Sequence, residues 1–575
     1  MDLREFNDKE VLLYEEDIMK ITELSFEEVQ ELVKTKEGIK QLIRLLTEKL
    51  EFNPDHSYFS FLGLLNLIEY LADDEIINTY IYQNDFIYNQ IINNRNDYYD
   101  YIARIIPIIE SDELKAAVFK KYKEIFVSED SEYGKTTYDT KSLIRTVFSF
   151  HSQIYIKEIF TDETISTILN KERFDTQSEV IKEIANKNTD EEKRECIIPE
   201  VLLFLDADYR AKPIISIESD SIKKECMNDD RIKEILLKDE RYHTYAKVIA
   251  SYKESNNIEE ALEEGINNNY FDGEDLAIMI SSIKGDAKKT EYLNDKRIKG
   301  KFSIDDEAAI VKSYSEEDAD QVKYDFINNR IINEAKQLKS IGLNQEYLKD
   351  RYHNAISNIL VSVNDKIKNK CLNDDQIKEL LHFSDICEIV KKYKDDIYKF
   401  TFIKENISKL AESSNHLLRE LMLTMKTEYK KQCLEDDEIL EVLRINKEKQ
   451  QGGLTIIDVI ASNYLYCISN YVNNKEDKDN RLSTEEIQQE QNKEDDFKDE
   501  FLKGKINNLD EREIFRVINS INNPELKLDW VIECASNNLK NLNYINNITN
   551  GIDKEEYKIV YDGENGMPVS YNHRQ

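Results

Sequence analysis

Residues Ser216–Lys233 read S-I-E-S-D-S-I-K-K-E-C-M-N-D-D-R-I-K. The phrase returns at Ser282–Lys299, where 10 of 18 positions are identical without a gap, and at Val361–Lys378, where 9 of 18 are identical. Weaker copies fill the gaps between these three, roughly 30 to 45 residues apart. Such a period is typical of helical repeat proteins, in which each copy contributes one pair of helices.

The phrase itself predicts a break followed by a helix. Ser219 and Asp220 are good N-cap residues, because a side-chain oxygen can accept a hydrogen bond from an unpaired amide of the new helix. The apolar stripe of that helix is formed by Ile222, Cys226 and Met227. The sequence therefore predicts that a helix begins at Ser219–Asp220.

A second break follows at Asn228–Asp230, whose carboxylates can cap the next helix. Lys223 and Lys233 are expected on solvated faces of the two helices. A single helical hairpin of this composition cannot bury its apolar side chains alone, so neighbouring hairpins are expected to stack. The predicted fold class is all-α, an α-solenoid of stacked helical hairpins with a short extended C-terminal tail.

The expected organisation follows from where the phrase is clear and where the composition changes. Tyr80–Tyr101 is rich in Tyr, Asn and Ile and is interpreted as helical, whereas Lys558–Tyr561 with Asp562-Gly563 indicates a strand and a turn. The predicted parts are an N-terminal helical capping region at 1–100, a helical repeat array at 101–472, a charged linker or exposed loop at 473–500, a C-terminal helical repeat at 501–550 and an extended tail at 551–575.

Charge and composition narrow the function classes. The 575 residues carry 79 Lys and Arg against 115 Asp and Glu, a formal net charge of −36. A field of that sign disfavours binding to nucleic-acid phosphates or to anionic lipid. With 14 Gly and 6 Pro, the chain is too poor in turn residues for a β-sandwich or a Gly-rich nucleotide-binding fold. No signal peptide and no apolar run of membrane-spanning length is evident, so the predicted location is cytoplasmic.

Seven cysteines are scattered along the chain without a C-x-x-C pair. Four share one slot of the repeated phrase, in which other copies carry Tyr292, Phe326 or Trp530: Cys196, Cys226, Cys371 and Cys433. A slot that alternates between thiol and aromatic side chains is apolar. These cysteines are therefore expected to be reduced thiols in the core.

Three short motifs resemble catalytic or binding signatures, and each has a simpler interpretation. Gly134-Lys135-Thr136 matches the end of a phosphate-binding loop, but Glu129 stands where that motif needs Gly. Asp206-Ala-Asp208 and Asp318-Ala-Asp320 match a metal-binding D-x-D spelling, and at Asp318–Asp320 helix capping is the preferred interpretation. The acidic pairs that recur in the phrase are likewise interpreted as turn caps: Asp229/Asp230, Asp374/Asp375 and Asp436/Asp437.

The remaining candidates also favour structural roles. The seven histidines do not pair at i, i+3 or i, i+4, so a metal site would need assembly over long sequence distances. Trp530 occupies the apolar slot, and His573-Arg574 lies in the tail. No catalytic, cofactor-binding or metal-binding residue is therefore predicted, no cofactor is expected, and the residues of a binding face are unknown.

The repeated phrase resembles the α-solenoid repeats of the HEAT, armadillo and TPR type in the broad sense, without the specific spellings of TPR or ankyrin. Its consensus S-[IL]-x-S-D-x-[IL]-K is also similar to divergent helical repeats that precede an ATP-grasp-like amidoligase domain in some AT-rich microbial genomes. That second resemblance covers roughly Ile109–Val531. The residues after Asn550 are too few for such a domain, so the resemblance implies no activity here.

Three functions remain open from the sequence. The first is a non-catalytic scaffold whose repeats bind a protein or peptide, with no nucleic acid and no membrane as partner. The second is the accessory repeat region of an enzyme whose catalytic domain is absent from this chain. The third is a nucleic-acid-binding solenoid, which a continuous Lys/Arg stripe would favour and a mixed or acidic concave face would disfavour.

Overall fold

A computed structural model describes most of the chain. The described residues are 15–52, 58–130, 135–138, 140–171, 173–413, 416–442, 456–462, 484–535, 541–552, 557–561 and 568–573. The chain divides into two compact units, each made of one long and one short range of residues. Unit 1 comprises 1–284 and 294–301, and unit 2 comprises 285–293 and 302–575.

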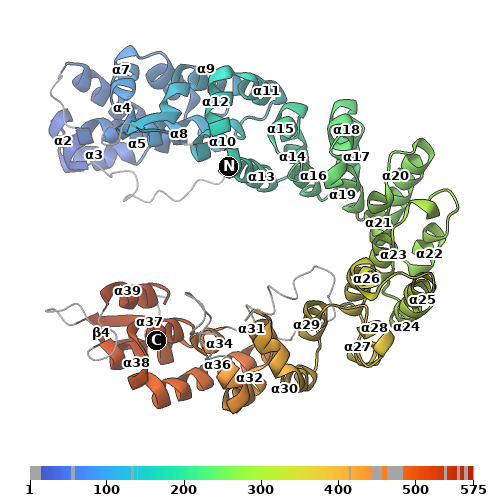
Figure 1. The fold of residues 1–575 in the computed structure, drawn as a ribbon. Coiled ribbons are helices and arrows are strands. Elements are labelled where there is room, and N and C mark those ends of the chain that lie inside the picture. The colour runs from blue at the N-terminus through green and yellow to red at the C-terminus, as the bar shows by residue number, and fades with distance from the viewer. Residues whose placement is uncertain are drawn as a thin grey trace. The chain divides into compact units, whose positions relative to one another are not determined.

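Unit 1 is built almost entirely of short helices (Figure 1). Labels with η mark turns of 3-10 or π-helix. Its elements are α2 (Glu15–Thr22), α3 (Phe26–Val33), α4 (Lys36–Phe52), α5 (Tyr58–Leu71), α6 (Asp74–Ile76), η1 (Ile77–Tyr82), α7 (Asp85–Asn93), α8 (Arg95–Ile108), α9 (Asp112–Tyr122), η2 (Lys123–Phe126), β1 (Val127–Asp130), β2 (Lys135–Tyr138), α10 (Thr140–Val147), α11 (Gln153–Thr161), α12 (Glu163–Lys171), α13 (Arg173–Ala185), α14 (Asp190–Cys196), α15 (Pro199–Phe204), α16 (Ala211–Ile215), α17 (Asp220–Met227), α18 (Asp230–Leu237), η3 (Glu240–Tyr242), α19 (Thr244–Ala250), α20 (Ser255–Asn268), α21 (Gly273–Ser282) and η4 (Lys299–Lys301).

Unit 2 is also built mainly of short helices, and it has a strand pair near its C-terminal end. Its elements are α22 (Asp286–Leu293), α23 (Ile304–Lys312), α24 (Ala319–Phe326), η5 (Ile327–Ile332), α25 (Asn333–Ser340), α26 (Gln345–Leu360), α27 (Asp365–Leu372), α28 (Asp375–Lys378), α29 (Phe383–Lys391), α30 (Asp396–Glu412), α31 (His416–Leu423), α32 (Thr427–Glu435), α34 (Ile456–Ile460), α36 (Thr484–Lys505), η7 (Ile506–Asn508), α37 (Glu511–Asn519), α38 (Pro524–Ala535), α39 (Leu542–Asn550), β3 (Tyr557–Tyr561) and β4 (Pro568–His573). The helical class expected from the sequence is confirmed.

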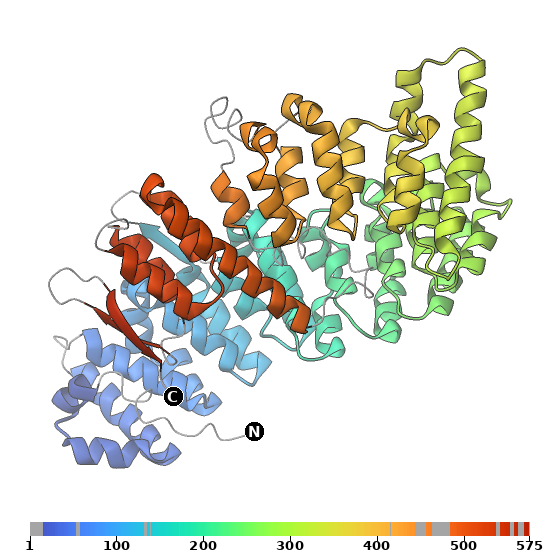
Figure 2. The same ribbon diagram turned by 90° about the horizontal axis from the view of Figure 1, so that it is seen from below.

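One set of helices in each unit packs in sequence, each against the next; we call these the row helices. In unit 1 they are α5, α8, α10, α13, α16, α19 and α21. In unit 2 they are α23, α26, α29, α31, α34, α37 and α39. The teal and green helices of unit 1 lie side by side in Figure 2. The helices between them, such as α14 and α17, contact one another in the same order.

Most row helices have two adjacent buried residues near their C-terminal end, here called the final core pair, and this favours stacking. Val248 and Ile249 lie in the last turn of α19, Ile310 and Val311 lie in the last turn of α23, and all four are at most 2% exposed. A serine or threonine often follows, and its hydroxyl donates to the carbonyl three residues earlier, as Ser251 does to Val248 at 2.6 Å. This contact satisfies one of the carbonyls that lack a partner at the end of the helix.

Two stretches differ from the sequence-based expectations. The charged stretch 473–500, predicted as a linker or exposed loop, contains most of α36, and four of its polar side chains are buried: Glu490, Glu494, Asp495 and Lys498. Residues 473–483 lie outside the described part of the chain. The other difference is the tail, where β3 and β4 pair antiparallel and β4 packs on α38, seen as paired dark red arrows in Figure 2. The predicted strand at Lys558–Tyr561 lies in β3, and its predicted turn at Asp562-Gly563 lies outside the described residues.

Candidate functional site

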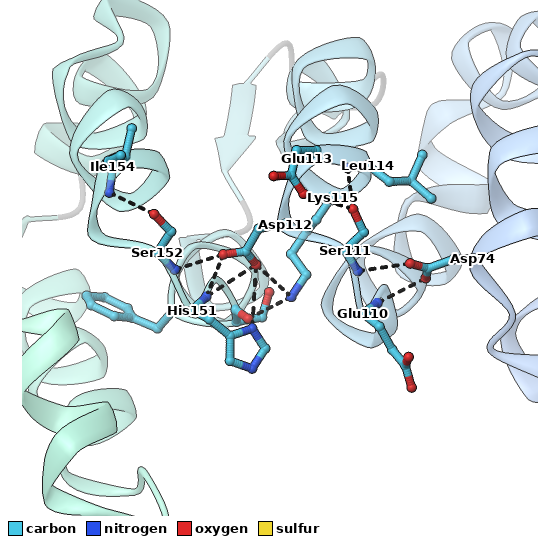
Figure 3. Close-up of polar contacts among 12 residues, drawn as sticks. Asp74, Glu110, Ser111, Asp112, Glu113, Leu114, Lys115, His151, Ser152 and Ile154 are labelled. Carbon is cyan, nitrogen blue, oxygen red and sulfur yellow. Dashed lines mark hydrogen bonds and ion pairs between the residues drawn. The ribbon is translucent and has the colours of Figure 1, made fainter.

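One polar contact recurs along the described part of the chain and joins one copy of the phrase to the next. In Figure 3, the carboxylate of Asp74 accepts hydrogen bonds from the backbone amides of Glu110 and Ser111, at 3.0 and 2.9 Å. Asp112 does the same for His151 and Ser152, the latter at 2.8 Å. Each carboxylate therefore satisfies two amides at the start of a segment 36 to 40 residues further along the chain.

The same contact recurs at the aspartate of an Asp-x-x-Lys motif. In both units the aspartate lies at or near the start of its helix, except Asp495, which lies inside α36. Its carboxylate accepts one or two loop amides of a later copy at 2.7–3.1 Å: Asp190 from Glu218 and Ser219, Asp220 from Lys253 and Glu254, Asp286 from Ser315 and Glu316, Asp320 from Asn364, Asp365 from Lys394 and Asp395, Asp396 from Lys426, and Asp495 from Asn522 and Asn523.

The lysine of the motif makes the second half of the contact. Lys223 donates to the carbonyl of Ser251, the residue that ends α19, at 2.7 Å. Equivalent bonds of 2.6–2.8 Å run from Lys115 to Ser149, Lys193 to Ser216, Lys289 to Ser313, Lys368 to Lys392, Lys399 to Thr424 and Lys498 to Ser520. A cation at a helix C-terminus is favourable because the last carbonyls lack partners and carry partial negative charge.

These lysines are buried, except Lys193, which is half-buried, and this corrects the expectation for Lys223. Its side chain was expected on a solvated face, but Lys223 is 2% exposed. Burial lowers the pKa of Lys223, and the nearby carboxylates of Asp220 and Glu218 oppose that shift. Lys233, the second lysine expected in solvent, is half-buried and pairs with Glu264 at 2.6 Å. A buried ammonium needs a partner, and the motif supplies both a carboxylate and a carbonyl.

The helix starts were predicted in part correctly. Asp229 caps α18 by accepting from the amides of Arg231 and Ile232, and Asp374 and Asp436 do the same for their own helices. Asp220 was also expected to cap its own helix, but it binds the next copy instead. The amides of Lys253 and Glu254 outweigh the effect of burial, which alone would raise the pKa of Asp220, so that pKa is lowered.

The three catalytic-looking motifs are not brought together. Lys135 and Thr136 lie in strand β2, which pairs with β1, and Gly134 is outside the described residues. Asp206 pairs with Arg173 at 3.0 Å in the loop before α16. Asp318 makes no side-chain cap, and Asp320 accepts from the amide of Asn364, so the capping expected at Asp318–Asp320 is replaced by the contact between copies.

The cysteine slot is buried, as the sequence predicts. Cys226, Cys371 and Cys433 are 0% exposed, and Cys196 is 1% exposed. Burial raises the pKa of Cys226 to about 11 and that of Cys433 to about 12, so both thiols stay protonated at neutral pH. Trp530 is also buried, and its indole N–H donates to Asp499 at 3.1 Å. Cys467 lies outside the described residues.

Two clusters of histidine and aspartate assemble over long sequence distances, which the sequence did not reveal. Nδ1 of His353 lies 3.2 Å from Asp385, and the ring of His382 lies 4.7 Å from that of His353. In unit 1, Nδ1 of His243 lies 2.9 Å from Asp275, near Asp272. Each cluster places three possible ligand atoms within 4.8 Å of one another, a number that can hold a divalent cation with exchangeable ligands. The carboxylates also serve helix starts, since Asp385 accepts from the amide of His382 at 2.8 Å.

A row of basic side chains is the second feature that the sequence did not reveal. One position near the C-terminal ends of α8, α10, α13, α16 and α19 is basic and exposed: Arg104, Arg145, Lys182, Lys212 and Lys247. Two buried residues follow it in four of these helices, and in α13 half-buried Glu183 and buried Ile184 follow Lys182. We call these five residues the basic row. Their spacing in the sequence, 30 to 41 residues, hides them in a chain that is acidic overall.

Within the described ranges, no helix is both long and apolar enough to cross a membrane. No protein-family model matches this chain, and no curated protein sequence matches it.

Proposed function

We propose that the chain is a binding scaffold, in which the copies of the phrase stack as an α-solenoid and one face of the stack binds a segment of another protein. The contact between copies carries the proposal. Among the described residues, seven Asp-x-x-Lys motifs, such as Asp220 and Lys223, place the carboxylate at the start of the next outer helix and the ammonium at the end of the next row helix. Asp230 and Lys233 have the same spacing, but Lys233 pairs with Glu264. The Asp and Lys side chains of the seven motifs therefore support the stacking of one copy on the next.

Stacking of this kind leaves the exposed positions of the row helices to vary between copies. The residue before the final core pair is Lys212 in α16, Lys247 in α19 and Ala309 in α23, while the core pairs themselves stay apolar. A surface built from one variable position per helix is the form of binding face that helical repeat proteins use. Fold-level analogy supports binding as the function class, and the partner has to be argued from the surface itself.

A library of unstructured peptides displayed on phage and panned against the full-length chain tests this function. We expect enriched peptides that share a sequence pattern and compete with one another for the chain. An unrelated helical protein of similar size and net charge serves as the control. Enrichment no greater than on that control would contradict the binding function.

A further inference from the structure

The basic row of unit 1 is the surface feature that the contact between copies does not explain. Its five members lie on consecutive row helices, each packed on the next. Figure 1 shows α10, α13, α16 and α19 following one another along one side of the unit. All five side chains are exposed, with Arg145 and Lys182 at 56% and 55%. The row is continuous over five helices in a chain of net charge −36.

The helix dipole alone does not account for the row. A basic residue in the last turn of a helix is favourable wherever it stands, because the helix C-terminus is partly negative. Of the later row helices, α37 carries Arg516 at the same position, but the five from α21 to α31 lack a basic residue there. That position is occupied by Ile278 in α21, Ala309 in α23, Asn358 in α26, Glu388 in α29 and Glu420 in α31.

Internal ion pairs compensate only one end of the row. Nε of Arg104 lies 2.8 Å from Glu69, and Nζ of Lys182 lies 3.2 Å from Glu179. Toward the other end, Lys212 lies over the ring of Tyr209 at 4.1 Å. Among the described residues, neither Lys212 nor Lys247 has a carboxylate within 4.0 Å of its ammonium. The row therefore presents ammonium groups that a partner's anions could neutralise.

The spacing of the basic row matches the spacing of every third side chain in an extended polyproline II segment. Packed helices lie about 8–10 Å apart, so consecutive charges of the row are separated by about that distance. A polyproline II segment advances about 3.1 Å per residue with three residues per turn, so every third side chain returns to the same side after about 9 Å. Acidic residues at every third position of such a segment would each face one basic residue.

The acidic residues within the row favour a protein segment over a nucleic acid. Glu69, Glu179 and Glu183 lie beside the basic side chains, with Glu183 3.7 Å from Arg145. A nucleic-acid strand carries a phosphate at every nucleotide, and its continuous negative charge would lie against these carboxylates. A peptide can place neutral residues opposite them.

We propose that the basic row binds an extended, acidic segment of a partner protein, with Asp or Glu at every third residue. The proposal rests on the binding function proposed above and names the chemistry of its partner. Arg145, Lys182, Lys212 and Lys247 form ion pairs with the carboxylates of the segment, and Glu179 and Glu183 face its neutral residues. Because the ion pairs are exposed, the affinity falls as salt is added.

Fluorescence anisotropy with labelled peptides tests the proposal. The probe is a sixteen-residue peptide with Glu at every third position between Ser and Pro, and the control peptide has the same composition with its Glu residues grouped. The row variant of the full-length chain is K182E/K212E/K247E. The matched control variant changes three exposed lysines of unit 1 outside the row helices, K120E/K157E/K238E, and so alters the net charge equally.

The wild type and the control variant should bind the spaced peptide about tenfold more tightly than the grouped peptide, and the row variant should lose about tenfold or more of that affinity. Equal loss in both variants would show that only net charge matters and would overturn the proposal. Tighter binding of a single-stranded oligonucleotide than of the spaced peptide, with the same sensitivity to the row, would replace the acidic segment by nucleic acid. Circular dichroism and thermal melting of both variants establish that they are folded.

The two proposals fail in different ways. If panning selects peptides that bind the row variant as well as the wild type, the binding function stands and the basic row is not its site. If panning selects no peptide and the spaced peptide does not bind, both proposals are overturned.

Discussion

The two units carry the same motif but different charges at the same surface position. In unit 1, Asp220 and Lys223 hold the next copy, and in unit 2, Asp365 and Lys368 do so with the same three hydrogen bonds. The aligned residue near the helix end is basic on five consecutive row helices of unit 1, but neutral or acidic on the four consecutive row helices α23, α26, α29 and α31 of unit 2, where α37 alone among the described row helices carries a basic residue, Arg516. The shared Asp-x-x-Lys motif stabilises the fold, and the position whose charge differs between the units is the one for which we propose a binding function.

The largest expected effect is loss of the shared aspartate. Asp220→Ala leaves two loop amides without their acceptor and the buried Lys223 without its carboxylate, which should cost about 2–4 kcal/mol of unfolding free energy. Asp365→Ala should cost about as much in unit 2. Urea denaturation of each variant measures the loss, and Asp229→Ala, which removes only a helix cap, is the control at about 1 kcal/mol. A loss at Asp220 no larger than at Asp229 would show that the contact between copies is not a main stabiliser.

The shared cysteine slot should respond almost as strongly, and alike in both units. Cys226→Ser and Cys433→Ser each place a hydroxyl at a position that is 0% exposed. Each should destabilise by about 1–3 kcal/mol, because burying a hydroxyl without a partner is unfavourable. Thermal melting measures both, with the wild type as reference. Unchanged melting in both variants would contradict a core role for the slot.

Acid should weaken the contact in unit 1 in a defined direction. The folded-state pKa values of Asp190 and Asp220 are lowered, since loop amides outweigh the opposing effect of burial. A lowered pKa contributes stability that is present above the unfolded value of about 3.9 and is lost as pH falls through the folded value. The stability advantage of the wild type over Asp220→Asn should therefore shrink below about pH 4. An advantage that stays constant down to pH 2 would contradict the ionised role of Asp220.

The smallest effect is expected at the position where the units differ. Lys212→Ala and Lys247→Ala remove exposed side chains that make no ion pair with the described residues, so the unfolding free energy should change by no more than about 0.5 kcal/mol. The same holds for Asn358→Ala in unit 2. Denaturation curves check this, and a loss of more than about 1 kcal/mol at Lys212 or Lys247 would assign the basic row to stability and remove the reason to seek its partner.

Local sequence signals predicted the helices and their starts well. The apolar stripe around Ile222 and Met227, the cap at Asp229 and the buried slot at Cys226 all follow from side chains within one turn of one another. Contacts that span a whole copy could not be predicted in the same way. Lys223 was expected in solvent because its partner, the carbonyl of Ser251, lies 28 residues away.

In the charged stretch at 473–500, local composition again failed to predict burial, although the sequence does contain one indication of it. A run so rich in Lys, Glu and Asp predicts solvent exposure when each residue is considered alone. Asp495 and Lys498 nevertheless have the spacing of the Asp-x-x-Lys motif, and both are buried against Asn522, Asn523 and Ser520. The motif, used as a search pattern, would have marked Asp495–Lys498 as a candidate copy, along with segments such as Asp230–Lys233 and Asp375–Lys378, which have the same spacing.

The candidate binding surface was hidden for a related reason. The basic row becomes visible only after the row helices are aligned by their final core pairs, because its members are tens of residues apart in the sequence. From the sequence alone, a continuous Lys/Arg stripe was expected to favour nucleic-acid binding. The mixed surroundings of the stripe, with Glu179 and Glu183 beside Arg145, then favour an acidic protein segment as the partner.

Hydrogen–deuterium exchange at the backbone amides of Lys253 and Glu254 tests most directly whether Asp220 holds the next copy. Both residues lie in an exposed loop, where amides normally exchange fast, yet both amides donate to Asp220, at 2.9 and 3.0 Å. We predict slow exchange at both amides in the wild type and fast exchange in Asp220→Ala. Exchange at the rate of an unstructured peptide in the wild type would contradict the contact on which the stacking of the copies depends.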